Sequence, residues 1–413
     1  MRAIIVLATS VLVCAPAFAH GPEAPARYRL EEVRPPASLL TPCLPGYRVY
    51  AQGTVINDLG VAVGNFNCYS QIDPATVTSS FSGAPFVWAS WFGPLILNDS
   101  DPATTTGSFA TTINNRGEVF GADVGSVFVG VKWSLAGGFE TIFPNDPECD
   151  VLKLDVAVAG NGRYSVGYGY RQSPDLPIPG LCLAPSWLTR SPSGTVVTDI
   201  INADPRDINV FNSAVGVKDQ KSAIRFQVVT KELRVLHAGD ETHQAAPTDI
   251  NDLGEVSGYV ATVNPAPAPG ECSYISARAL RWDRNDRETV LPLLPGATSS
   301  RAWSVGTDGE TVGESGPGQY CDPQNSTNER ATLWRDGGAF DLNEAIPPYL
   351  GVTLASANSI NRRGQILAYG YRNADPLVIC PVFMIDPVTQ LPFYDVTQRC
   401  RYQRIYVLTP AGH

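Results

Sequence analysis

The residues best suited to chemistry in this sequence are its nine cysteines, spread over 413 residues. Cys14 falls in an apolar N-terminal stretch, and no C-x-x-C pair occurs, which argues against zinc and thioredoxin-type sites. An even number of widely spaced cysteines in an exported chain favours disulfides. The eight candidates are Cys43, Cys68, Cys149, Cys182, Cys272, Cys321, Cys380 and Cys400.

Histidines and clustered acidic residues offer weaker candidates. His20 would become the N-terminal residue after signal removal, where an amine and an imidazole together bind copper. His237 and His243 flank a Gly-Asp-Glu segment, which would suit zinc or acid–base chemistry. The NDSD cluster at 98–101 would suit calcium, although an ordinary Asx turn explains it better. Solvated loops explain the histidines more simply, so we expect neither metal nor cofactor.

Sequence motifs of catalysis are absent. The chain has no G-x-S-x-G elbow, phosphate loop or dinucleotide fingerprint in a suitable context, and its carboxylates are scattered. It carries 30 Lys and Arg against 40 Asp and Glu, a net charge of −10 with no basic block. Nucleic-acid binding depends on clustered Lys and Arg, so we expect no such partner. We predict no catalytic, cofactor-binding or metal-binding residues.

The N-terminus resembles a secretory signal. Arg2 precedes an apolar run over residues 3–15, and Ala17-Phe18-Ala19 provides a small-x-small cleavage site. We expect a signal peptide at 1–19 and a flexible leader at 20–27. Later apolar runs are too short to cross a bilayer, which predicts a secreted or periplasmic protein without a membrane span.

A repeated turn organises the rest of the chain. The copies read INDLGVAVG, INNRGEVFG, VAGNGRYSVG, INVFNSAVG, INDLGEVSG, VGTDGETVG and INRRGQILA, and they begin at Ile56, Ile113, Val158, Ile208, Ile250, Val305 and Ile360. A period near 50 residues is typical of propellers and solenoids. The whole of 28–413 is therefore expected to form one repeat-built domain.

Turn chemistry explains this motif. Asn or Asp at the first corner accepts backbone hydrogen bonds, and Gly three residues later permits a left-handed conformation. In the fourth copy Asn replaces that Gly, and Asn is the residue that next best tolerates positive φ. The predicted turn residues are Asn57, Gly60, Asn114, Gly117, Asn209, Asn212, Asn251, Gly254, Gly309, Asn361 and Gly364.

Four strands, A to D, are expected in each repeat. Strands A and B flank the INxxG turn, strand C often ends in an aromatic residue, and strand D follows a short turn. Seven such units predict a seven-bladed, all-β propeller. YRLEEV (28–33) resembles a D strand without a blade, and RIYVLTP (404–410) resembles a final C strand. Pairing these two segments would close the ring, with a hairpin insertion at 376–400.

Strand alternation places the connections on two faces. A–B and C–D turns share one face, whereas B–C and D–A connections, which hold all eight cysteines, share the other. Eight cysteines permit 105 pairings, among which we favour Cys43–Cys68, Cys149–Cys182, Cys272–Cys321 and Cys380–Cys400. The candidate contacts of a ligand on this loop-rich face are Tyr168, Tyr170, Tyr320, His237 and His243.

The repeat resembles the bacterial extracellular HAF-repeat family. AFDL at 339–342, SANSIN at 356–361 and the terminal YVLTP follow the order of that family's unit, and the resemblance spans about 28–410. It implies export and a β-propeller. It brings no catalytic residues that would transfer to this chain.

These features predict a non-catalytic binding or scaffold protein, which we expect to be a monomer. The expected ligand is an extracellular or envelope polysaccharide or protein, held on the loop-rich disulfide face. The alternative is a propeller-type hydrolase or lyase acting on extracellular glycans. An acidic pair in the central channel would favour the enzyme, and an aromatic platform would favour binding.

Overall fold

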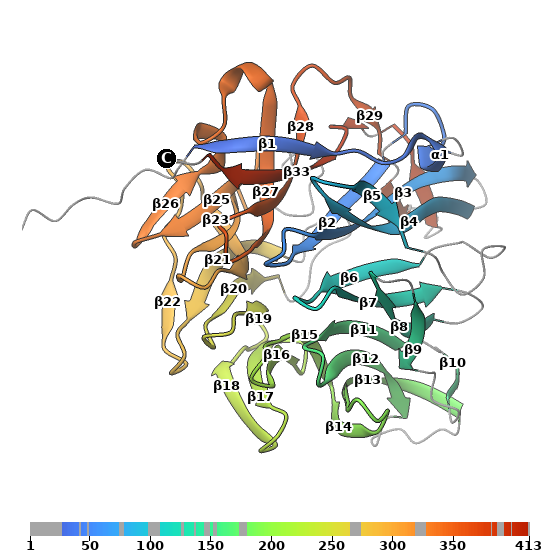
Figure 1. Cartoon of the computed structure of the whole chain (residues 1–413), viewed down its shortest axis with the longest axis vertical. Coiled ribbons are helices and arrows are strands. Elements are labelled where there is room, and N and C mark those ends of the chain that lie inside the picture. Colours follow the sequence, from blue (N-terminus) through green and yellow to red (C-terminus); the bar gives the residue numbers. More distant parts are fainter. Residues whose placement is uncertain are drawn as a thin grey trace, which may run out of the picture.

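The computed structural model shows a ring of seven antiparallel sheets, each with four strands in its main path, around a central channel (Figure 1). This confirms the expected seven-bladed propeller. The structure describes residues 27–40, 43–47, 49–73, 78–97, 108–124, 128–135, 138–143, 149–151, 155–172, 180–264, 274–318, 328–380, 382–385, 392–397 and 399–411. No helix within these ranges is long and apolar enough to cross a membrane.

Blades 1 to 6 follow the chain, and the innermost strand comes first in each. Blade 1 consists of β2 (Val49–Ile56), β3 (Ala62–Asp73), β4 (Thr78–Ala89) and β5 (Gly93–Ile96). Blade 2 consists of β6 (Phe109–Ile113), β7 (Glu118–Val124), β8 (Phe128–Ser134) and β9 (Phe139–Phe143). Blade 3 consists of β11 (Asp155–Gly160), β12 (Ser165–Gln172), β13 (Gly180–Arg190) and β14 (Val196–Ile201), with β10 (Cys149–Val151) parallel to β13.

The next three blades repeat this order. Blade 4 consists of β15 (Ala203–Ile208), β16 (Ser213–Lys218), β17 (Ser222–Gln227) and β18 (Glu232–His237). Blade 5 consists of β19 (His243–Ile250), β20 (Val256–Val263), β21 (Tyr274–Trp282) and β22 (Glu288–Val290). Blade 6 consists of β23 (Ser299–Val305), β24 (Thr311–Gly316), β25 (Arg330–Arg335) and β26 (Gly338–Asp341), followed by short 3-10 turns at Leu342–Glu344 and Pro348–Leu350.

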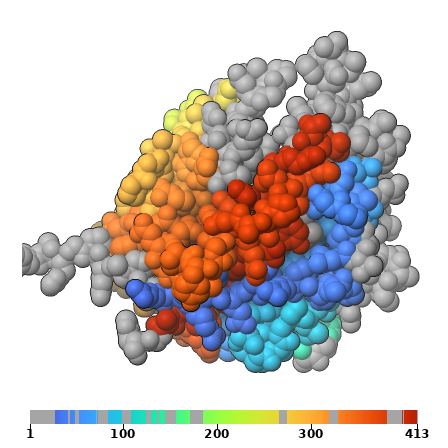
Figure 2. Space-filling model, turned by 90° about the horizontal axis from the view of Figure 1, so that it is seen from above, coloured from blue at the N-terminus to red at the C-terminus, as the bar shows by residue number. Residues whose placement is uncertain are grey.

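Blade 7 closes the ring with both ends of the chain. Its inner strands are β27 (Val352–Ile360) and β28 (Ile366–Arg372), and β33 (Arg404–Pro410) and β1 (Tyr28–Val33) complete it. β1 pairs antiparallel with β33 from Tyr28↔Pro410 to Val33↔Ile405, as the sequence predicted. Figure 2 shows blue N-terminal residues packed directly against orange and red C-terminal ones.

Buried aromatic residues and turn glycines explain why the repeat folds in this way. The aromatic side chains near the ends of six C strands are at most 4% exposed, because they pack between sheets: Trp88, Trp133, Trp187, Phe226, Trp282 and Trp334. In the INxxG turns, the residue at the Gly position of the repeat has a left-handed backbone conformation, with positive φ. For example, φ is +81° at Gly60, and it is +62° at Asn212, the one copy with Asn.

Several short elements lie on the face of the ring opposite the INxxG turns. They include α1 (Ala37–Leu40) before blade 1. Between β28 and β33, β29 (Val378–Ile379) pairs with β32 (Arg399–Cys400), and a hairpin forms from β30 (Val382–Ile385) and β31 (Pro392–Asp395).

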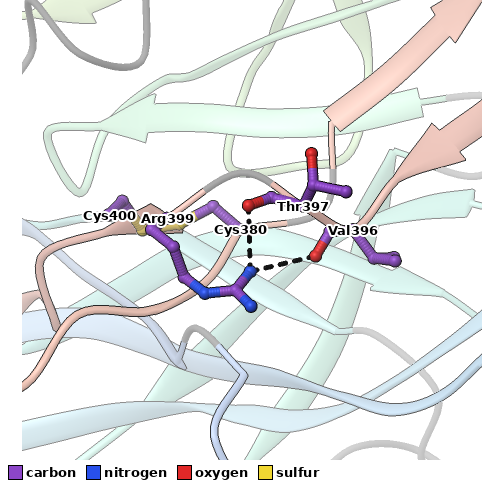
Figure 3. The surroundings of a disulfide bond; sticks show 5 residues. All are labelled: Cys380, Val396, Thr397, Arg399 and Cys400. Atoms are coloured by element: carbon purple, nitrogen blue, oxygen red, sulfur yellow. Dashed lines mark hydrogen bonds between the residues drawn. A yellow bond between two sulfur atoms is a disulfide. The ribbon is translucent and has the colours of Figure 1, made fainter.

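Two disulfides lie on this face. Cys43 bonds to Cys68, with Cα atoms 5.5 Å apart, and Cys380 bonds to Cys400, with Cα atoms 5.9 Å apart. Beside the second disulfide, Arg399 donates hydrogen bonds to the carbonyls of Val396 and Thr397 (Figure 3). The side chains of the other four cysteines, Cys149, Cys182, Cys272 and Cys321, lie outside the described residues.

Candidate functional site

A girdle of asparagine side chains surrounds the turn-side end of the channel. Each Asn uses its Oδ1 to accept backbone N–H groups of its own turn; Asn57, for example, accepts from Leu59 and Val61 at 3.1 and 3.0 Å. Its Nδ2 donates to a carbonyl of the following blade. These inter-blade bonds join Asn57 to Asn114, Asn114 to Gly160, Asn161 to Asn209, Asn209 to Asn251, Asn251 to Gly306 and Asn361 to Asn57, at 2.7–3.0 Å. The girdle therefore fixes both the turns and the ring.

Blade 6 interrupts the girdle because Gly306 occupies the Asn position. Gly306 accepts from Asn251 but has no side chain to donate to Asn361 in blade 7. Blades 6 and 7 are linked by a hydrogen bond next to this position, because the N–H of Ile360, the residue before Asn361, donates to Ser304 Oγ at 3.3 Å.

A second layer of inter-blade hydrogen bonds lies next to the girdle. It is made by the side chain that precedes the Ile or Val of the repeat motif, and we call these side chains latches: Asp207, Asp249, Ser304 and Ser359. Ile250 N–H donates to Asp207 Oδ2 at 3.2 Å. Asp249 Oδ2 accepts from Ser304 Oγ at 2.7 Å and from Val305 N–H at 2.9 Å. Ile56 N–H donates to Ser359 Oγ, so these side chains connect blades 4, 5, 6, 7 and 1 in sequence.

Asp207 and Asp249 form an acidic pair in the channel. Burial, together with the neighbouring carboxylate of Asp249, raises the pKa of Asp207 well above its ordinary value. A side-chain hydrogen bond to Asp249, in which the protonated carboxyl of Asp207 is the donor, raises this pKa further. Because each residue also accepts a backbone N–H of the next blade, both are tied into the ring structure.

A β-bulge at one position in every A strand turns an extra side chain toward the channel. The bulged residues are Thr54, Thr111, Val158, Arg206, Thr248, Trp303 and Asn358. Thr111 and Thr248 donate to carbonyls of the next blade at 2.9 Å. Arg206 and Trp303 are the two bulged residues with large side chains; the other five are Thr, Val or Asn.

These layers enclose a cavity of about 1040 Å³, open at the turn side. Its wall combines the girdle, the Asp and Ser latches and the bulged residues with the rings of Tyr259 and Tyr369. At the rim, Arg362 Nη2 lies 3.1 Å from Asp58 Oδ2 and 3.8 Å from Asp252 Oδ2, although these residues belong to blades 7, 1 and 5. The cavity is thus polar at its mouth and partly aromatic farther in.

A cluster of aromatic and charged residues lies between blades 5, 6 and 7 on the loop side of the latches. Trp303 packs edge-to-face on Tyr259 with centroids 5.8 Å apart, and Arg301 lies 5.5 Å from the Tyr259 centroid. Arg301 also pairs at 3.8 Å with Glu314, which is 2% exposed. Burial raises the pKa of Glu314, and burial together with Glu314 raises the pKa of Glu329 to about 8.

Four of the five residues proposed from sequence for ligand contact are described by the structure, and they lie on three different blades. Tyr168, on β12, is half-buried, and burial and Asp204 raise its pKa; Tyr170 follows on the same strand. His237 Nδ1 is 2.7 Å from Glu288 Oε2, which links the outer strands of blades 4 and 5. His243 is exposed and contacts Thr242. Tyr320 lies outside the described residues.

A repeat position that the sequence analysis missed supplies part of the aromatic wall. The residue following the small residue at the end of the repeat motif interacts with a neighbouring blade: it is Asn65, Tyr168, Tyr259, Glu314 or Tyr369 in five of the blades. Aligning the seven copies one residue past the motif would have shown this variation. Within the described residues, no group of three or more His, Cys, Asp or Glu side chains is placed to hold a metal ion.

No family model matches this chain, and no curated protein sequence matches it significantly. Among solved structures, it is similar to the acylaminoacyl peptidase of Pyrococcus horikoshii, with 7% identity and a TM-score of 0.48 over 80% of this chain and 51% of that one. It is also similar to a streptogramin B lyase, with 10% identity and a TM-score of 0.46 over 93% and 98% of the two chains. The β-propeller domain of the trilobed protease from Pyrococcus furiosus gives 7% identity and a TM-score of 0.39 over 88% and 98%.

The chain thus spans about half the length of the P. horikoshii peptidase. At such identities and TM-scores these likenesses carry no argument about activity. The architecture rests on the strand pairing of the chain itself.

Proposed function

We propose that this chain is an exported, non-catalytic binding protein that holds a segment of an extracellular polysaccharide in its channel cavity. The signal-like N-terminus, the HAF-like repeats and the two disulfides support export. This proposal moves the binding site from the loop-rich face to the turn-side channel, because that is where the described residues provide a cavity.

The composition of the cavity wall carries the proposal. A volume of about 1040 Å³ is slightly larger than the usual range for ligand pockets, roughly 300–1,000 Å³. Amide, hydroxyl and carboxyl groups line it together with Trp303, Tyr259 and Tyr369. Sugars present hydroxyl groups at their edges and C–H groups on their ring faces, so a polar wall with aromatic rings complements both. The girdle fixes this wall before any ligand arrives, which lowers the entropic cost of binding.

The acidic pair supports binding better than glycoside hydrolysis. Catalytic carboxyl pairs in glycosidases are about 5–5.5 Å or 6.5–9.5 Å apart, which leaves room for the sugar or a water. Asp207 and Asp249 instead contact each other and accept backbone N–H groups of adjacent blades. The pair that would have favoured an enzyme thus has a structural explanation.

Calorimetric titration of the oxidised mature protein with oligosaccharide fragments tests the proposal. Tyr259→Ala should weaken binding at least tenfold by removing a ring contact, and Trp303→Phe should weaken it by a smaller factor because a smaller aromatic ring remains. Trp91→Ala is the matched control, since Trp91 is 64% exposed in a C–D turn. Circular dichroism would check that each variant is folded.

Mass spectrometry of the recovered ligand separates the two functions. An intact saccharide supports binding, and a cleaved one establishes the alternative hydrolase or lyase. Binding that is unchanged in Trp303→Phe and Tyr259→Ala would place the ligand elsewhere. If no saccharide binds and envelope proteins do, the polysaccharide hypothesis is wrong.

A further inference from the structure

Two arginines line the rim of the cavity, in the turns of the adjacent blades 2 and 3. Arg116 reaches across to the next turn, where its Nη1 donates to the Gly162 carbonyl at 3.4 Å. A Cβ at Gly162 would lie only 2.6 Å from Arg116 Cζ, so this turn leaves room for the guanidinium. Arg163 follows directly, with its Cζ 5.7 Å from the centroid of the Tyr164 ring. Both guanidinium groups are therefore positioned, and both side chains are exposed.

Neither arginine has a carboxylate partner among the described residues, which distinguishes them from the other arginines of the cavity wall. Arg206 pairs with Asp204 at 2.8 Å, and Arg362 pairs with Asp58 at 3.1 Å. In the neighbouring blades 4 and 5, the carboxyl groups of Asp207 and Asp249 are bound by each other and by backbone groups. In a chain of net charge −10, the sector formed by Arg116 and Arg163 is a local excess of positive charge at the mouth of the cavity.

Two neighbouring, prepositioned guanidinium groups suit an oxyanion. Each offers several N–H donors in a planar fork that matches a carboxylate, sulfate or phosphate. An anion bound between them would interact favourably with both positive charges. A neutral sugar would gain no comparable benefit at this position.

We propose that Arg116 and Arg163 bind the anionic group of an acidic polysaccharide, a uronate carboxylate or a sulfate ester, while the adjoining sugar units enter the cavity. This inference rests on the proposed function and specifies its ligand class. Nucleic acid is a poor alternative, because its affinity requires many basic contacts and this chain is acidic overall.

The test compares ligands that differ only in charge. Calorimetry with the oxidised mature protein would use a short uronate oligomer, the same oligomer with methyl-esterified carboxylates, and a sulfated oligomer of equal length. The uronate or the sulfated form should bind at least ten times more tightly than the ester, and this preference should shrink as salt rises. Which of the two acidic forms binds more tightly identifies the source of the anion.

Variants then assign the effect to the two residues. Arg116→Gln and Arg163→Gln should each weaken acidic-ligand binding about tenfold, and the double variant about a hundredfold, while binding of the ester stays unchanged. Arg287→Gln is the matched control, because Arg287 is exposed in a C–D turn of blade 5.

The outcomes separate this inference from the proposed function. Equal binding of acid and ester, unaffected by the arginine variants, overturns the inference and leaves the cavity as a neutral-sugar site. A preference for acid that survives the double variant also overturns it. Absence of binding by every saccharide contradicts the proposed function itself.

Discussion

The two sides of the ring are held together by different means. On the turn side, the same asparagine recurs from blade to blade and each copy makes the same bonds, as Asn57 and Asn209 do. On the loop side, disulfides cross-link the connections, and buried charges such as the Arg301–Glu314 pair occur in one blade only. A position that repeats serves the architecture. A position that varies is where an individual function has room to develop.

Removal of a disulfide should produce the largest change in this comparison. Cys43 and Cys68 are 25 residues apart, and a cross-link over such a loop stabilises a fold by about 3 kcal/mol. The double variant Cys43→Ser/Cys68→Ser, measured by urea unfolding, should lose about that free energy. If its midpoint matches that of the native protein, the loop side does not depend on this cross-link.

Loss of one girdle asparagine should cost somewhat less. Asn209→Ala removes the bond to the Asn251 carbonyl and leaves Phe211 and Ser213 N–H groups without their acceptor. Unsatisfied groups at this 5% exposed site should lower the free energy of unfolding by about 2 kcal/mol. Asn285→Ala, in an exposed turn, is the control, and its free energy of unfolding should change little. Equal losses of stability in both variants would show that the girdle does not stabilise the ring.

Asp207 should make the turn side sensitive to pH. Its pKa is raised in the folded state, so the native protein holds this proton longer than the unfolded chain does. The contribution of Asp207 to stability is therefore greatest at low pH and falls as pH rises from about 4 through the raised pKa, by at most about 1.4 kcal/mol per pH unit. In Asp207→Asn the amide replaces the protonated carboxyl, so the decline of the unfolding free energy between pH 4 and 8 should become shallower; Glu314 and Glu329, whose pKa values are also raised, account for the decline that remains.

Asp252→Asn is the matched control for that experiment, because Asp252 lies at the rim beside Arg362. It should keep the pH slope of the native protein. The same slope in Asp207→Asn would show that the shared proton does not govern stability in this range.

Completion of the girdle should give the smallest effect, and a favourable one. A Cβ on Gly306 would meet its nearest neighbours at 3.6 Å, so a side chain fits there. Gly306→Asn would add the missing donor to the Asn361 carbonyl and an acceptor within its own turn, which we expect to raise stability by about 1 kcal/mol. A lower urea midpoint would mean that the interruption in blade 6 is required by the fold.

The pattern of turn and strand residues in each repeat predicted the fold, because turn and strand preferences depend on neighbours in sequence. The INxxG turn, the buried aromatic at the end of strand C and the pairing of 28–33 with 404–410 all follow from such preferences. The residues that line the cavity could not be predicted from such local preferences. The contact of Asp207 with Asp249 and the neighbouring positions of Arg116 and Gly162 join different blades, and a bulge of one residue decides which side chains face the channel.

The closure of blade 7 has a consequence for how the protein resists force. Tyr28 and Pro410, the first and last paired residues, are partners in the same antiparallel ladder. Tension applied through the two ends of the chain would therefore act across a single rung, and it would separate β1 from β33 one hydrogen bond after another rather than shear the whole ladder at once. The ring should yield to pulling at low force, even where heat and denaturant leave it intact.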